Sequence, residues 1–415
     1  MRNKSRAITP PENCTGCGLC ANVCTHDAIR MAWNRDGFLV PEVNTNTCIN
    51  CGACVIACPA QPKHLEKLRH SNTDVQPIMS AGGWNHAQET LARSSSGGIF
   101  TALAEYIFKL GGCVFGVVWD NKDTAVYTKA ENMEDLDAMR GSKYVQAIPG
   151  FAYRQVKDEL KKGRQVLFCG TSCQVYALKR YLKKEYENLL LVDILCHGVP
   201  SRHLLQSYIR AYEKQQKNEI TVLQFRDKAG DWQKYRIKKF FKNGTSISHC
   251  NWEDMFMRLF IGDYVLNTAC YSCPHAKLPR VGDISLGDFW GNLQKRHSDW
   301  PIAQGIASIL GNTEKGCTIL QKLQNNKTIS LNEVPFNELY EGQPYTYYRD
   351  GSVAVPPARK LLLNQLKTKP LGLMYDQLFN QVRFGPFRFK RQGMLHLILK
   401  KVKSLVLLFT CRKTQ

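Results

Sequence analysis

Apolar and polar residues alternate in a helix-and-strand pattern along much of this 415-residue chain. Between about residues 98 and 110, apolar side chains recur at helical spacing directly after the stretch SSSGG, and the apolar strand run CVFGVVWD follows a Gly-Gly turn. Short apolar runs predict further strands at 165–169, 189–195, 221–225 and 306–311. Helical spacing predicts helices between them at about 152–162, 174–184, 202–217 and 313–324. This alternation predicts an α/β body with a mixed or parallel sheet.

Three stretches lack this alternation. The first 70 residues hold only short apolar runs, of which GFLVPEV at 37–43 predicts one short strand. Residues 71–92 are polar with few periodic apolar positions, and they predict a linker. From about residue 346 the chain forms a basic tail that ends in RFGPFRFKRQGMLHLILKKVKSLVLLFTCRK.

The basic tail contains no apolar run long enough to cross a membrane. Its longest apolar run, 405–409, falls far below the roughly 20 residues that a bilayer span needs. A basic, apolar-rich helix can still lie in the membrane interface, drawn by anionic lipid, or it can dock on the body as an ordinary terminal helix. The sequence leaves both alternatives open.

The first 70 residues contain one cysteine motif twice. CTGCGLCANVC and CINCGACVIACP both separate four thiols by two, two and three residues. Three thiolates at this spacing can hold three corners of an iron-sulfur cubane, and in two-cluster ferredoxins the fourth cysteine serves the other cluster. The doubled pattern disfavours a disulfide scaffold or a zinc site. We therefore assign one 4Fe-4S cluster to Cys14, Cys17, Cys20 and Cys58, and a second to Cys48, Cys51, Cys54 and Cys24.

Residues between these cysteines fit the same assignment. Gly16, Gly18 and Gly52 lack a Cβ, as a backbone pressed against a cluster requires. Pro59 follows Cys58, whereas Thr25 follows Cys24, a departure that leaves the ligand spacing unchanged.

Composition narrows the class of protein and its partners. The length predicts about two to four domains. The start, MRNKSRAITPPEN, has no apolar leader, and clusters and free thiols persist in reducing compartments, so we expect a cytoplasmic protein, or one at the inner membrane face if the tail binds lipid. The net charge of +21 suits an acidic partner, bound cofactors or a membrane surface. Nucleic acid is disfavoured, because no base-reading or stacking module accompanies the basic residues.

Beyond residue 93 the motifs resemble a known family. The stretches SSSGGIFTAL, RGSKYVQA, VLFCGTSCQVYALK, DILCHGVPS, FRDK and CYSCPHAKLPRVGDISLGDFWG are similar to those of coenzyme F-420 hydrogenase/dehydrogenase beta subunits. The resemblance implies a catalytic core that binds FAD beside a third 4Fe-4S cluster. Carried over by motif, that cluster falls on Cys173, Cys196, Cys270 and Cys273. The family commonly has Pro where Ser172 stands, which leaves the neighbouring thiol in place.

The motifs and the resemblance together predict an α+β and α/β chain. An N-terminal bacterial-type two-cluster ferredoxin module precedes an α/β flavin and iron-sulfur catalytic core and a helical, basic C-terminal tail. The predicted boundaries are 1–70 for the ferredoxin module, 71–92 for the linker, 93–170 and 171–345 for the two parts of the core, and 346–415 for the tail.

The expected flavin site lacks a dinucleotide fingerprint, since no G-x-G-x-x-G follows a strand. Instead, hydroxyls and free N–H groups at a helix start favour phosphate, although serine there can equally be an ordinary cap. We place the pyrophosphate near Ser95, Ser96, Gly97 and Gly98, with further contacts from Arg140, Ser142 and Lys143.

Two residues are candidates for proton delivery, His197 beside Cys196 and Asp288 in GDFWG. A histidine titrates near neutrality, although a lone histidine is more often structural. The expected function is an iron-sulfur flavoprotein oxidoreductase, a reductase that takes electrons from ferredoxin or a similar redox protein and passes them through clusters and FAD to an organic substrate. The alternatives are a non-catalytic electron-transfer subunit of a larger complex, and a protein of the membrane surface acting in glycan synthesis.

Overall fold

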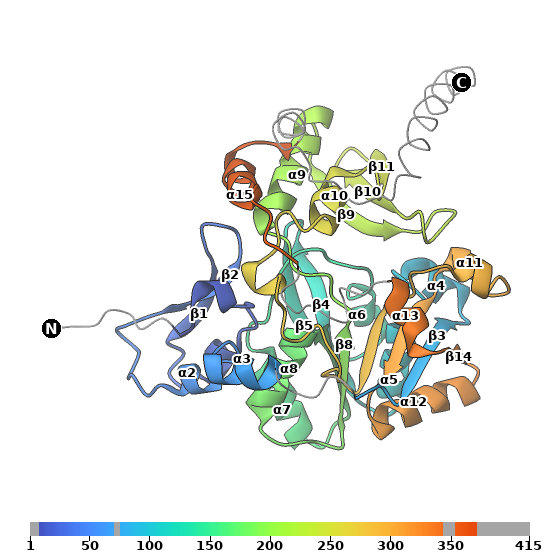
Figure 1. Ribbon diagram of the computed structural model, residues 1–415, viewed down its shortest axis with the longest axis horizontal. Coiled ribbons are helices and arrows are strands. Elements are labelled where there is room, and N and C mark those ends of the chain that lie inside the picture. The colour runs from blue at the N-terminus through green and yellow to red at the C-terminus, as the bar shows by residue number, and fades with distance from the viewer. Residues whose placement is uncertain (1–7, 70–74, 343–352, 372–415) are drawn as a thin grey trace. The chain divides into compact units, whose positions relative to one another are not determined.

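The computed structural model describes residues 8–69, 75–342 and 353–371 (Figure 1). Within these ranges the centre of the chain is a nine-stranded sheet in the order β14-β3-β13-β12-β8-β7-β4-β5-β6. β4, β7, β8 and β12 are parallel neighbours, and antiparallel strands flank them on both sides, as the pattern predicted for a mixed sheet. The strands are β3 Met79–Asn85, β4 Cys113–Asn121, β5 Thr124–Ala130, β6 Ala147–Ile148, β7 Val166–Thr171, β8 Leu189–Ile194, β12 Ile284–Asp288, β13 Ala307–Gly311 and β14 Ile329–Glu333.

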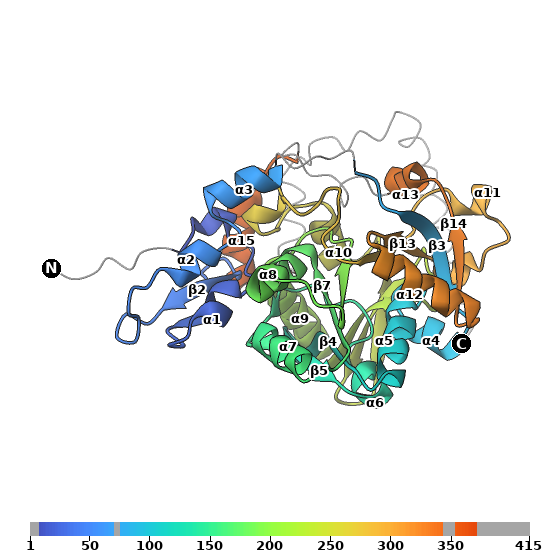
Figure 2. The same ribbon diagram turned by 90° about the horizontal axis from the view of Figure 1, so that it is seen from below.

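Helices cover both faces of this sheet (Figure 2). On β4, Val114 packs with α5 (Ile99–Lys109) and α12 (Glu314–Asn325), while the adjacent Phe115 packs with α7 (Ala152–Lys161) and α8 (Ser172–Leu182). Successive side chains of a strand point to opposite faces, so the continuous apolar runs of the central strands are buried on both sides. The predicted helices at 98–110, 152–162, 174–184 and 313–324 are therefore confirmed as the outer layers.

A second, smaller sheet contains the strand predicted at 221–225. β9 (Ile220–Asp227), β10 (Arg236–Phe241) and β11 (Ser246–Cys250) are antiparallel and lie with α9 (Arg202–Gln216) and α10 (Met255–Ile261), apart from the large sheet (Figure 1). β10 alternates buried and half-buried residues, the pattern of a sheet with one covered face. The sequence pattern placed β9 in the α/β alternation, and the pairing puts it in this separate sheet.

The stretch 71–92, expected to be a linker, includes an inner strand. β3 pairs with β13 and β14, and α4 (Gln88–Arg93) follows it. Its apolar pattern is weak because Gly82 and Gly83 stand where no side chain fits: a Cβ on Gly82 would lie 2.4 Å from the Trp300 ring. Close approach of neighbouring groups, which only glycine allows, therefore removed the signal that normally identifies a strand.

The cysteine-rich N-terminal segment forms its own small cluster of elements. β1 (Ile29–Trp33) and β2 (Leu39–Val43) form an antiparallel hairpin, which confirms the short strand predicted at 37–43. The helices here are α1 (Leu19–Val23), α2 (Ala53–Ala57) and α3 (Pro62–Arg69). The remaining short elements are η1 Pro11–Asn13, α6 Met133–Asp137, η2 Thr268–Cys270, α11 Leu293–Arg296, η3 Ile302–Gln304 and α13 Phe336–Gly342.

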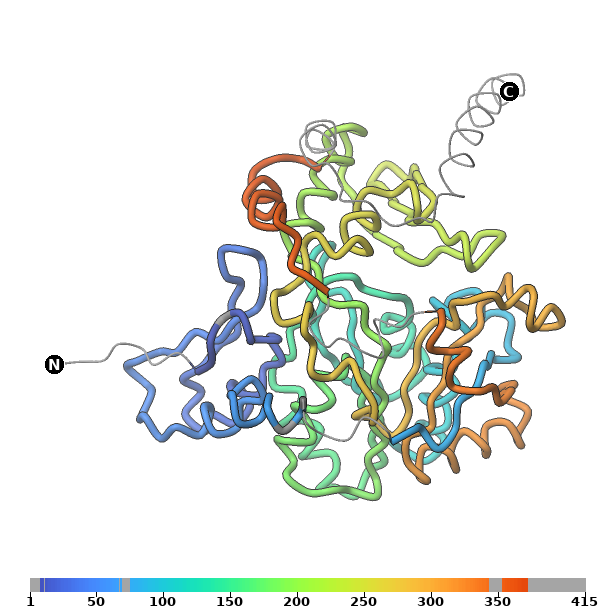
Figure 3. Tube along the Cα trace, in the orientation of Figure 1, coloured from blue at the N-terminus to red at the C-terminus, as the bar shows by residue number. Residues whose placement is uncertain are grey.

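Part of the predicted tail docks on the body. α15 (Arg359–Thr368) lies beside α9, where the Arg210 guanidinium donates to Leu366 O at 2.8 Å (Figure 3). Within the described ranges no helix combines the length and apolar character needed to cross a bilayer. The basic stretch after residue 371, with its expected helix, lies outside the described residues.

Candidate redox site

The four cysteines assigned to the first cluster line one cavity. Cys14, Cys17, Cys20 and Cys58 surround about 340 Å³ of empty space, partly open to solvent, together with apolar residues such as Leu19 and Met31. Burial, and after it the neighbouring thiols, raises the pKa of Cys14 to about 12. Thiolates ligate metals, so iron must displace these protons when it binds. An apolar cradle lined by four thiols fits a 4Fe-4S cubane.

The glycines of this loop lie against the body of the protein. Gly16 and Gly18 both adopt positive φ, which glycine tolerates. A Cβ on Gly16 would lie 2.1 Å from Gln146 Nε2, and one on Gly18 would lie 2.8 Å from Pro149. These glycines therefore allow the cysteine loop to approach the body of the protein, and their expected approach to a cluster stays a prediction. Gly52 also has positive φ, and open space surrounds its missing Cβ.

The cysteines of the second set lie closer to solvent. Cys51 is exposed, while Cys24, Cys48 and Cys54 are half-buried. Burial and, more weakly, the thiols of Cys51 and Cys24 raise the pKa of Cys54, so Cys24 lies near the second motif although it belongs to the first. The exchange of the fourth ligand between the two clusters stays a prediction.

The four cysteines carried over to the core come from separate loops that meet. Cys173 opens α8, Cys196 follows β8, and Cys270 and Cys273 lie in and after η2. Burial first, and then the Cys273 thiol, raises the pKa of Cys173 well above its usual range, with smaller contributions from Cys17 and Cys196. A Cβ on Gly198 would lie 3.4 Å from Cys270 Cβ, so Cys270 also borders the loop after Cys196.

In the described part of the chain, no three His, Cys, Asp or Glu side chains meet as ligands of one metal ion. The thiols of a cubane bind different irons, so a cluster requires no such group.

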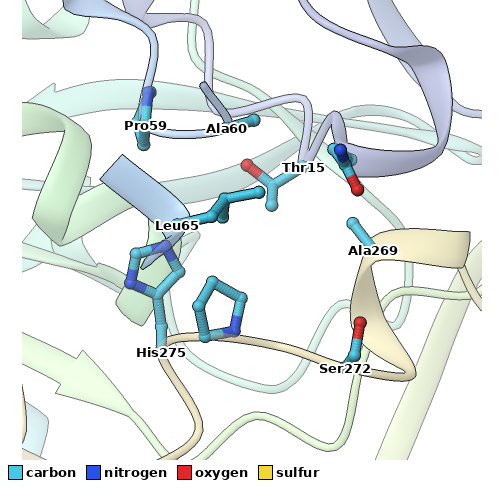
Figure 4. A pocket seen from close by; sticks show the side chains of 9 residues that line it. Thr15, Pro59, Ala60, Leu65, Ala269, Ser272 and His275 are labelled. Atoms are coloured by element: carbon cyan, nitrogen blue, oxygen red, sulfur yellow. The ribbon is translucent and has the colours of Figure 1, made fainter. Parts of the chain in front are cut away.

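Direct hydrogen bonds join the cysteine-rich segment to the core beside these thiols. Asn267, three residues before Cys270, donates from Nδ2 to Cys14 O at 3.1 Å. The fully buried Tyr153 donates its hydroxyl to Cys17 O at 2.6 Å. A cavity of about 360 Å³ lies at this junction, bordered by Thr15, Leu65, Ser272 and His275 among others (Figure 4). The first thiol set thus lies next to the core set.

The structure brings SSSGG and RGSKY together. Ser142 donates its hydroxyl to Ser95 Oγ at 2.9 Å, and Gly98 precedes α5 with positive φ. Not every hydroxyl or glycine is available to a ligand: Ser96 Oγ donates to Ile306 O at 2.8 Å, and a Cβ on Gly97 would lie 2.2 Å from Gly83 O. Ser96 and Gly97 therefore hold the loop against the sheet. The hydroxyls of Ser95 and Ser142, which contact each other, are the ones that a ligand could meet.

Arg226 of the FRDK motif fixes this loop and was absent from the predicted site residues. Its guanidinium donates to Ser95 O at 3.1 Å and to Asp288 Oδ2 at 2.6 Å, and it stacks over the Tyr235 ring at 4.1 Å. Burial alone would lower the pKa of Arg226, but the Asp288 carboxylate together with Tyr144 and Tyr235 outweighs burial and raises that pKa. Asp288 is thus placed as the counterion of Arg226, and its expected role in proton delivery stays a prediction.

Two guanidinium groups near this loop have donors left over. Among the described residues, Nε of Arg140 and Nε of Arg226 are buried without a hydrogen-bond partner. Arg140 also pairs with Asp137 at 3.1 Å. Buried donors without partners are costly and fit an anionic group such as a phosphate.

Lys143 and Lys228 contact backbone carbonyls. Lys143 Nζ donates to the carbonyls of residues 139, 140 and 141, and burial lowers its pKa to about 8. Lys228 Nζ donates to Ser96 O at 3.0 Å, and burial, followed by the charge of Arg226, lowers its pKa to about 8. In this arrangement Lys143 stabilises its own turn, while Lys228 holds the serine loop.

His197 lies between the core cysteine loop and an aromatic group. Its Nε2 is 3.0 Å from Asp263 Oδ1 without the geometry of a hydrogen bond, and its ring meets Phe260 edge to face at 5.1 Å. The two residues predicted to deliver protons, His197 and Asp288, therefore have different ionic partners. Their catalytic roles remain predictions.

The residues that the sequence interpretation missed share one feature: their partners are distant in the chain. Arg226, Lys228 and Asn267 each contact a loop more than 100 residues away. FRDK, with two basic residues at a strand end, was the available signal for Arg226 and Lys228. No local signal identified Asn267.

Comparisons with known proteins agree with this organisation. Residues 13–61 match the family model described as a 4Fe-4S dicluster domain. Residues 81–153 and 163–335 match the N-terminal and C-terminal models of the beta subunit of coenzyme F420 hydrogenase/dehydrogenase. A chain of the F420-reducing NiFe hydrogenase complex from Methanosarcina barkeri, solved as a xenon derivative, is 16% identical, with 74% of this chain and 94% of that one covered and a TM-score of 0.46. No curated protein matches.

Proposed function

Since the chain belongs to the beta-subunit family of coenzyme F420 hydrogenases/dehydrogenases and carries a 4Fe-4S dicluster domain, we propose that it is an iron-sulfur flavoprotein reductase. It accepts electrons from ferredoxin or a similar redox protein and delivers them to an organic substrate. The observation that carries this proposal is the junction of two thiol sets, where Asn267 and Tyr153 of the core donate hydrogen bonds to Cys14 O and Cys17 O.

Three thiol sets would hold the clusters, and the serine loop would hold FAD. When bound, 4Fe-4S clusters carry single electrons, and a flavin stores two for delivery together. The more exposed set, with Cys51 at the surface, is the one that a donor protein can approach. The buried set with Cys14 adjoins the core, so the protein's own loops keep the two regions in contact.

The core residues would bind and orient the flavin. The Nε donors of Arg140 and Arg226 supply positive charge for its phosphates, with the hydroxyls of Ser95 and Ser142 beside them. Trp232 and Trp290 stack at 4.8 Å next to Arg226 and exclude water from this side of the loop. His197 and Asp288 remain the candidates for proton delivery to the substrate.

A cofactor count tests this proposal. Protein purified without oxygen should contain about twelve irons and one FAD per chain, and about eight irons would remove the core cluster from the proposal. Arg226→Gln should lose flavin while it keeps its iron, because the change removes only the guanidinium. Exposed Arg30, with 76% of its side chain accessible, gives the matched control Arg30→Gln, which should keep both cofactors. If Arg226→Gln keeps full flavin, the proposed flavin site is wrong.

The same preparation separates the two functional alternatives. The family description names beta subunits, which favours a partner enzyme as the second candidate. Reduction of an electron-accepting organic substrate by the isolated chain, with dithionite as the donor, supports the reductase. Turnover that begins only after a partner protein is added supports the electron-transfer subunit.

A further inference from the structure

A fully buried ion pair lies beneath the core cysteines. The side chain of Arg280, 1% exposed, pairs with that of Asp193, which is 0% exposed, at the end of β8. Asp193 uses both carboxylate oxygens: Oδ2 also accepts the Ser172 hydroxyl at 2.7 Å, and Oδ1 accepts the Ser285 hydroxyl at 2.6 Å. A buried charge needs such partners, because its desolvation is expensive.

The Arg280 guanidinium contacts three chain segments, each within one or two residues of a predicted ligand. It donates to Ser172 Oγ at 2.7 Å, next to Cys173 at the start of α8. It donates to Ile194 O at 3.2 Å, two residues before Cys196.

The third contact reaches the last thiol loop. Arg280 donates to His275 O at 3.4 Å, two residues after Cys273. One planar group with five donors thus ties together three loops, which follow one another along the chain at intervals of about 20 and about 80 residues.

Position, rather than burial alone, distinguishes this pair. A second ion pair with fully buried side chains, Lys239 with Asp254 at 3.2 Å, joins β10 to the start of α10 in the smaller sheet. Its partners include His249 Nδ1 at 3.0 Å and the backbone of β10, and these partners all lie more than two residues from any predicted ligand. The Lys239 pair therefore provides a matched control for the cost of disrupting buried charge.

We propose that Arg280 and Asp193 are positioning residues that hold the loops of Cys173, Cys196 and Cys273 at the separation required by the core iron-sulfur cluster. This inference rests on the proposed function, since it presumes that these thiols bind a cluster. Lysine cannot replace Arg280, because a single ammonium lacks the planar fork that reaches Ser172, Ile194 and His275 together.

The test compares Arg280→Lys and Asp193→Asn with Lys239→Met after anaerobic purification. Iron and sulfide are counted, and electron paramagnetic resonance of the dithionite-reduced protein records each cluster separately. Arg280→Lys and Asp193→Asn should each lose about four of about twelve irons and the resonance of the core cluster. Both variants should keep the resonances of the dicluster module. Lys239→Met should keep the full count of about twelve irons.

Three outcomes decide the inference. The inference is overturned if Arg280→Lys and Asp193→Asn keep their full iron content and an unchanged electron paramagnetic resonance spectrum. Equal iron loss in Lys239→Met also overturns it, because disruption of any buried charge would then suffice. If the wild-type protein contains only about eight irons, the core cluster of the proposed function is absent, and this result is known before any variant is compared. Asp193→Asn preserves the shape of the side chain, so it keeps the test readable if Arg280→Lys does not fold.

Discussion

Arg154 of the core donates hydrogen bonds to the C-terminal end of helix α1 in the ferredoxin module. Its removal therefore tests whether the core stabilises that helix. α1 has five residues, so it ends with carbonyls that lack partners within the helix. The Arg154 guanidinium donates to Ala21 O at 3.0 Å, Asn22 O at 2.9 Å and Cys24 O at 2.5 Å. A positive charge at a helix C-terminus is favourable in addition to these bonds.

The magnitude follows from these contacts. Hydrogen bonds to a charged group contribute about 1.5–3 kcal/mol each, but with 28% of the Arg154 side chain exposed, water can replace part of them. The ion pair to Asp27 at 2.8 Å adds little, because 62% of that side chain is exposed. We expect Arg154→Ala to lower the free energy of opening α1 by about 2–4 kcal/mol.

Hydrogen exchange measures this opening directly. In the anaerobic holoprotein, amides at 21–24 should exchange about 30-fold to about 1,000-fold faster in Arg154→Ala, since each 1.4 kcal/mol is about tenfold. Arg30→Ala, at an exposed pair with Glu42 in the same module, should leave these amides unchanged. Exchange accelerated equally in both variants, or in neither, would refute the reasoning.

Four further substitutions test the assignments and the pH dependence of stability. Cys58→Ala and Cys24→Ala should each remove about four irons, but from different clusters, as separate resonances would show; loss of the same cluster would contradict the exchange of ligands. Ser172→Pro should lower the iron content of the core cluster and leave the resonances of the dicluster module unchanged, because it removes the hydroxyl that joins Arg280 and Asp193 to the start of α8; full iron in this variant would contradict that role. Lys228 has a pKa lowered to about 8, whereas an unfolded lysine keeps about 10.4. The folded chain therefore releases this proton first, and stability should rise between about pH 8 and about pH 10. Lys228→Met should remove that part of the rise, and an unchanged pH profile would contradict it.

The sequence alone determined the features that depend on short spacings. Thiols repeated at two, two and three residues identify the dicluster module, and the helix after SSSGG and the strands β7, β8 and β13 follow from apolar periodicity. These signals are local, because a turn of helix or a few residues of strand already contain them. Apolar periodicity failed to identify β3, because Gly82 makes room for the Trp300 ring and Gly83 for the neighbouring strands β13 and β14.

Only the tertiary structure decided which residues support the site. Arg280 meets Ser172 across 108 residues, Arg226 meets Ser95 across 131, and Asn267 meets Cys14 across 253. None of these contacts produces a pattern in the nearby sequence, since each depends on which strands and loops become neighbours in the folded chain. The eight thiols of the ferredoxin module could be predicted from their spacing, whereas the four core thiols were predicted from the family resemblance, and the contacts around both sets depend on the packing of distant segments.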